Sequence, residues 1–162
     1  MFIRPGPPLF LLALALALPA GCSRTAPPPS GLPHRHEHHP PHGGTPVVLG
    51  DEAYHIELVL DAPSGTLQAF ILDGEMEGFV RSAAPSIEIV AEAGGAPRTL
   101  VLAAVANPAT GETVGDTSLF QAQADWLRTA GEFDAVLKSI TIRGTTFTGV
   151  KFNFPKGNDT DG

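Results

Sequence analysis

Five of the chain's six histidines fall within the nine residues from His34 to His42, in the stretch HRHEHHPPH, with Glu37 among them. Neutral imidazole is a good ligand for Zn, Cu(II) and Ni, and several imidazoles on a flexible chain can close around one ion. The alternative is a hydrophilic tether that only gains positive charge as the pH falls. The pattern predicts a capacity to bind divalent metal, with these ligands: His34, His36, His38, His39 and His42.

His55 and Glu57 form a second candidate site. They stand two residues apart in the alternating run AYHIELVL, so a strand there places both side chains on one face, roughly 6.6 Å apart. A third convergent ligand would complete a metal site, and His42 is the histidine of the cluster nearest the folded domain. The alternative is a pair of ordinary surface residues.

Catalytic and nucleic-acid-binding patterns are missing from the sequence. It has no Gly-x-Ser-x-Gly elbow, glycine-rich phosphate loop or His-Glu-x-x-His helix. The net charge of −7, without a basic patch, argues against a nucleic-acid partner. We therefore expect neither an enzyme nor an organic cofactor. Any cofactor should be Zn, Cu or Ni.

Residues 1–21 read as a signal peptide. Its apolar run, LFLLALALAL, is too short to span a bilayer as a helix. It ends in Pro-Ala-Gly-Cys, which resembles the bacterial lipoprotein processing box and predicts lipidation of Cys22. The alternative is an ordinary secretory signal that leaves a free thiol. Serine rather than aspartate after the cysteine favours the outer membrane, so we expect a lipid anchor on the periplasmic face.

Composition divides the rest of the chain. Residues 22–45 are rich in Pro, Gly and His, which predicts a disordered tether. Residues 46–156 contain short β-branched runs separated by Gly, Pro, Asn and Asp, and residues 157–162 read as a disordered tail. The pattern predicts an all-β, antiparallel, immunoglobulin-like β-sandwich of about 7–8 strands.

Within this domain, Asp125–Gly131 is the one segment that suits a helix, of about two turns at most. Gly144 is expected first in the two-residue turn of a final hairpin. The alternating apolar positions predict this core: Ile56, Leu58, Leu60, Leu67, Ile71, Ile87, Ile89, Leu100, Leu102, Phe120, Ile140, Ile142, Phe147 and Phe152.

The segment HGGTPVVLGDEAYHIELVLDAPSGTLQAFILDG (His42–Gly74) is similar to the N-terminal region of some periplasmic adaptor subunits of heavy-metal efflux pumps. It also resembles a family of small exported bacterial proteins, and Ser118–Gly149 resembles their end. The shared pattern is His-Gly-Gly, a short strand ending in Gly, an acidic turn, and a strand carrying His-x-Glu. The resemblance implies an exported, metal-associated β-domain, with His42 and His55 as the residues that correspond to the family's pattern. The chain lacks the coiled hairpin of a complete adaptor.

The sequence thus predicts a membrane-anchored periplasmic protein that binds a divalent transition metal, as a buffer or chaperone beside a metal-efflux complex. The alternative is a cell-envelope interaction or scaffold module whose histidine-rich tether is incidental.

Overall fold

The computed structural model describes residue 2 and residues 39–159. Apart from residue 2, the signal peptide lies outside the described residues, as do Cys22, His34, His36 and His38, so the predictions made for them stay predictions. Among the described residues, no helix has the length and apolar character needed to cross a membrane.

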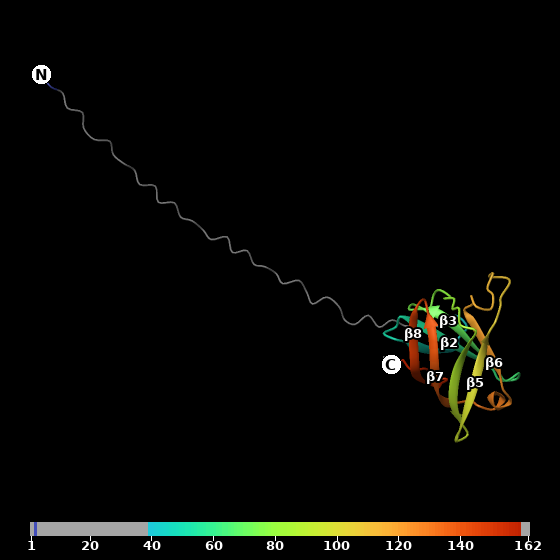
Figure 1. Ribbon diagram of the computed structural model, residues 1–162. Coiled ribbons are helices and arrows are strands. Elements are labelled where there is room, and N and C mark those ends of the chain that lie inside the picture. The colour runs from blue at the N-terminus through green and yellow to red at the C-terminus, as the bar shows by residue number, and fades with distance from the viewer. Residues whose placement is uncertain (1, 3–38, 160–162) are drawn as a thin grey trace. The chain divides into compact units, whose positions relative to one another are not determined.

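Eight strands form one antiparallel sheet in the order β1-β2-β3-β6-β5-β4-β7-β8. The all-β prediction is confirmed, with a single sheet in place of two facing ones. Its two edge strands, β1 and β8, approach each other, so the sheet curls into a nearly closed, barrel-like layer (Figure 1). The strands are β1 (Thr45–Leu49), β2 (Tyr54–Asp61), β3 (Thr66–Asp73), β4 (Ser86–Ala93), β5 (Ala96–Ala104), β6 (Leu119–Gln123), β7 (Phe133–Ile142) and β8 (Thr145–Phe154).

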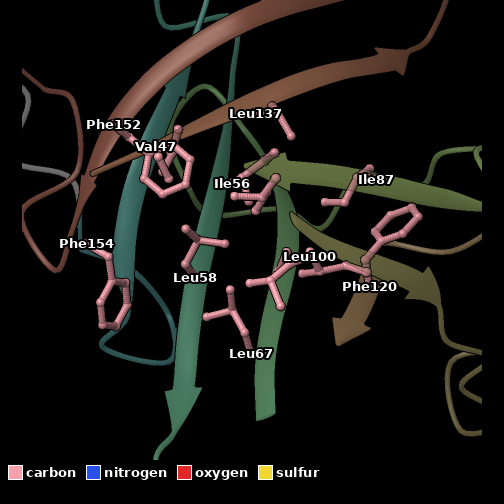
Figure 2. Packing of buried hydrophobic residues seen from close by; sticks show 14 of the residues in the cluster. Val47, Ile56, Leu58, Leu67, Ile87, Leu100, Phe120, Leu137, Phe152 and Phe154 are labelled. Atoms are coloured by element: carbon pink, nitrogen blue, oxygen red, sulfur yellow. The ribbon is translucent and has the colours of Figure 1, made fainter. Parts of the chain in front are cut away.

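The core fills the inside of this curled sheet. Figure 2 shows Val47, Ile56 and Leu58 of the first two strands facing the same interior as Leu137 and Phe152 of the last two. Twelve of the fourteen predicted core residues are buried, and Leu60 and Phe147 pack partly buried against them. Alternation along single strands found these positions because each strand keeps one face toward the interior.

Two local expectations come out differently. The segment expected to be helical forms one short 3₁₀ turn, η1 (Asp125–Arg128), which buries Leu127. The final hairpin turns at Arg143–Gly144, so Gly144 is the second turn residue rather than the first. Both turn residues have positive φ, 46° and 85°. This is the geometry of a type I′ turn, whose twist suits a two-residue hairpin.

The seam between β1 and β8 is closed by residues assigned above to the C-terminal tail. The N–H of Val48 donates to Oδ1 of Asn158 at 2.7 Å, and Nδ2 of Asn158 donates to the carbonyl of Val48 at 3.1 Å. The side-chain amide thus satisfies a residue of the edge strand as a neighbouring strand would. Gly157 and Asn158 therefore belong to the folded domain.

Replacing Asn158 with alanine should lower the free energy of unfolding by about 1–2 kcal/mol, because two hydrogen bonds to the edge strand are lost. Urea unfolding of the variant beside the wild type measures this. An unchanged midpoint would mean that water satisfies Val48 equally well.

A polar cluster fixes the long loop between β5 and β6. Oε1 of the buried Glu112 accepts hydrogen bonds from the N–H of Ser118 at 3.0 Å and from its Oγ at 2.7 Å. Thr110 Oγ1 donates to the other carboxylate oxygen at 3.0 Å. Burial acts to raise the pKa of Glu112, but these hydrogen bonds and the nearby Arg81 outweigh it and lower the pKa.

This lowered pKa sets an expected pH dependence. A carboxyl group with a lower pKa in the folded state contributes stability above its unfolded pKa and loses that contribution as the pH falls through the folded value. Glu112→Gln should therefore destabilise the protein near neutral pH, and the difference from wild type should shrink below about pH 4. Thermal unfolding of both proteins at about pH 7 and about pH 3 measures it; a pH-independent difference would contradict this assignment.

Candidate functional site

The His-Gly-Gly segment folds back onto the outer face of β2. Residues Pro40–Gly43 form a β-turn in which the N–H of Gly43 donates to the carbonyl of Pro40 at 3.0 Å. Proline at the second position and glycine at the fourth both favour such a turn. The turn places His42 over Glu57, the residue that pairs with Pro46 in the β1–β2 register.

The carboxylate of Glu57 is the centre of this arrangement. Its side chain has no exposed surface. Oε1 accepts hydrogen bonds from the backbone N–H of His42 at 2.8 Å and from that of Gly44 at 2.9 Å. Oε2 lies 2.8 Å from Nδ1 of the His42 ring. We call His42, Gly43, Gly44 and Glu57 the carboxylate clasp. Hydrogen bonds of this kind are what a buried charge requires.

The two glycines make the clasp possible in different ways. Gly43 has φ of +68°, and the bend lets the N–H groups on either side of it converge on one oxygen. At Gly44 a Cβ atom would stand 2.5 Å from the carbonyl oxygen of Leu58 and 2.8 Å from Cγ2 of Val59. The backbone at Gly44 therefore packs directly onto β2, and no other residue fits there.

Aromatic rings hold the imidazole in place. The His42 ring stacks on Phe70 with centroids 4.0 Å apart and an interplanar angle of 18°. Phe70 is the β3 residue that pairs with Glu57 across the sheet. Phe79 tilts toward the His42 ring at 5.8 Å and is 52% exposed. Because Nδ1 and one ring face are both engaged, the imidazole has a fixed direction.

The second ring nitrogen of His42, Nε2, remains available for another interaction. A carboxylate only accepts hydrogen bonds, so the Nδ1 that bonds Glu57 carries the hydrogen, and in the neutral ring Nε2 holds the lone pair. The His42 side chain is 38% exposed. Within residues 39–159 the polar contact of the His42 ring is to a carboxylate rather than to a hydroxyl that it could activate. The arrangement suits metal ligation better than nucleophilic catalysis.

The other predicted site residues fall in three groups. His55 shares the outer face of β2 with Glu57 but has no exposed surface, and its Nδ1 lies 3.2 Å from the carbonyl oxygen of Asp73, so it is a covered residue rather than an exposed ligand. His39 lies within the described part, just before the turn. His34, His36, His38 and the lipidation site Cys22 lie outside it. Residues 39–159 contain no group of three or more His, Cys, Asp or Glu side chains placed to hold a metal ion.

One expectation about this site changes, and one feature of it was not expected. Glu57 meets His42, as the approach of the His-Gly-Gly segment suggested, but as a hydrogen-bond partner and not as a neighbouring ligand. The aromatic contacts of Phe70 and Phe79 were not foreseen. Phe70 and Leu72 are apolar residues on the outer face of β3, where polar residues are usual. Their presence in the sequence could have indicated that another segment packs on this face.

Comparisons with protein-family models, with curated proteins and with solved structures give no match for this chain.

Proposed function

We propose that this chain is an exported, lipid-anchored protein of the periplasmic face that binds a divalent transition metal of the Zn, Cu and Ni class. The observation that supports the proposal is the 2.8 Å contact between Nδ1 of His42 and the fully buried carboxylate of Glu57. Histidines that ligate metals almost always give their other ring N–H to a carboxylate, a carbonyl or water, which fixes the tautomer and the ring direction.

In this proposal His42 is the fixed ligand and the neighbouring histidines complete the coordination. A metal ion needs more donors than one imidazole, and His34, His36, His38 and His39 precede His42 by eight residues or fewer. Glu57 orients the His42 ring without ligating the metal, and His55 is not a metal ligand. Imidazole-rich sites follow the general divalent series, so binding strength should rise from Ni²⁺ to Cu²⁺ and fall again at Zn²⁺.

The cellular part of the proposal rests on the sequence. The processing-box motif at Cys22 supports a membrane anchor, with the outer membrane favoured, and the resemblance to efflux adaptors supports a buffer or chaperone beside a metal-efflux complex. No enzymatic activity, organic cofactor or nucleic-acid partner is expected.

Zinc titration by calorimetry tests the metal assignment, using the full chain and point variants. A truncation that starts at Thr45 is unsuitable, because it removes His42 and Gly44 and leaves the buried Glu57 without those donors. His42→Asn is the sharper variant: the asparagine amide can still donate to Glu57 from the position of Nδ1, but it offers nothing in place of Nε2.

We expect His42→Asn to weaken zinc binding at least about tenfold, and replacement of His34, His36, His38 and His39 by glutamine to do the same. Equal affinity of His42→Asn and wild type would overturn the role of His42. Absence of zinc and copper binding by the wild type would overturn the metal function and favour an envelope interaction module.

A further inference from the structure

A groove with a mixed polar and apolar lining lies away from the carboxylate clasp. It has a volume of about 600 Å³ and is lined by the segment that leads into β4, by β7, by the turn after it, and by Gly115 and Asp116. That volume is within the range of small-molecule sites, roughly 300–1,000 Å³. Nothing in the proposed metal function uses it.

The lining combines three kinds of surface. Ala83, Ala84 and Ile140 supply apolar atoms. Ser86 and Ser139 supply hydroxyl groups that can both donate and accept. Arg81 and Arg143 also line the groove, from separate parts of the chain. Arg81 forms ion pairs with Asp116 and Glu112, so Arg143 is the lining cation without an ion pair in the described part of the chain.

Arg81 is held in a defined position. Its Nη1 donates to Oδ2 of Asp116 at 2.9 Å, and its Nη2 donates to the carbonyl of Thr110 at 2.6 Å. Its Nε also lies 3.7 Å from the buried Glu112 carboxylate. These contacts engage the donors of Arg81 within the protein, so Arg143 is the arginine left to bind a ligand.

Arg143 occupies a backbone position that favours other residues. Its φ is +46° in a two-residue turn, where Asn, Asp and Gly are preferred. A side chain other than these costs roughly 1 kcal/mol in the left-handed region. The sequence nevertheless has an arginine there, beside the groove. Residues kept in unfavourable conformations cluster at functional sites.

We propose that this groove binds an acidic saccharide. The sugar carboxylate would bond the fork of Arg143, whose donors match a carboxylate in pairs. The sugar ring would lie on the alanines, and its hydroxyls would bond Ser86, Ser139 and the carboxylate of Asp116. A phosphate dianion fits less well, because Asp116 also lines the groove and repels it more strongly than it repels a monoanion.

NMR titration of the labelled full chain tests this, with trigalacturonate as the probe, maltotriose as its neutral counterpart and inorganic phosphate as the simple anion. We expect trigalacturonate to shift the backbone amides of residues 82–86 and 139–144 in a saturable way, and maltotriose to bind at least about tenfold more weakly. Phosphate binding as tight as that of trigalacturonate would overturn the saccharide assignment. So would absence of a saturable shift in these residues.

Arg143→Asn removes the guanidinium and keeps a residue that the turn favours. It should weaken trigalacturonate binding about tenfold or more while the melting temperature stays equal or rises. Lys151→Asn, an exposed change of equal charge on β8, is the matched control and should leave binding unchanged. If both variants lose the same affinity for trigalacturonate, Arg143 contributes only general electrostatic attraction, and the assignment of this binding site is overturned.

Discussion

Alanine at position 44 should lower the free energy of unfolding by about 3 kcal/mol or more. The added Cβ would stand 2.5 Å from a backbone oxygen of β2, which cannot move aside as a flexible side chain could. Relief requires the His-Gly-Gly segment to lift away, and that removes the donors from the fully buried Glu57 carboxylate. Denaturant unfolding of the variant and the wild type measures the difference.

Gly43→Ala is the matched control for this prediction. A Cβ at position 43 meets no atom within 4 Å, so the substitution introduces only the strain of a positive φ. We expect a loss of roughly 1–2 kcal/mol from that strain. If the two alanine variants are equally stable, the backbone at Gly44 does not need to lie against β2, and the clasp is looser than described.

Replacing Glu57 with glutamine should reduce zinc affinity by about 10–100-fold, although the residue cannot reach the metal in our proposal. The glutamine carbonyl can still accept from the two backbone N–H groups. Its amide then faces Nδ1 of His42 and donates to it, which moves the ring hydrogen to Nε2 and blocks the nitrogen that should ligate. Zinc titration of the full-length variant measures the loss.

The control is Glu88→Gln, which removes the same charge at an exposed position of β4. Its zinc affinity should match that of the wild type. If both variants lose affinity equally, the effect of Glu57 is one of net charge. If Glu57→Gln binds zinc as the wild type does, the tautomer of His42 is irrelevant to the metal.

Local pattern was sufficient for the strands and most of the core. Ile56 and Leu58 alternate with His55 and Glu57, and such alternation within one strand indicates which of its faces lies inside. The closure of the sheet could not be predicted from this alternation. A sandwich and a single curled sheet have the same alternation along their strands. They differ in whether β1 lies near β8, and that depends on contacts between residues far apart in the sequence, such as Val48 and Asn158.

The sequence singled out His42 and Glu57 but not the hydrogen bond between them, nor the contacts of His42 with Phe70 and Phe79. Alternation placed His55 and Glu57 on the outer face of β2, and the outer face of an antiparallel sheet is commonly exposed to solvent. Here both residues are fully buried, and the His-Gly-Gly turn lies over Glu57. Only the fold shows that this carboxylate turns to Nδ1 of His42 while His55 turns to the carbonyl of Asp73.

NMR of the labelled imidazole nitrogens, recorded before and after addition of zinc, tests whether His42, oriented by Glu57, ligates the metal through Nε2. We expect the neutral His42 ring to carry its hydrogen on Nδ1, and zinc to shift the Nε2 resonance of His42 together with the ring resonances of the tether histidines. A hydrogen on Nε2 before zinc is added, or a zinc effect that leaves His42 unchanged, would contradict it.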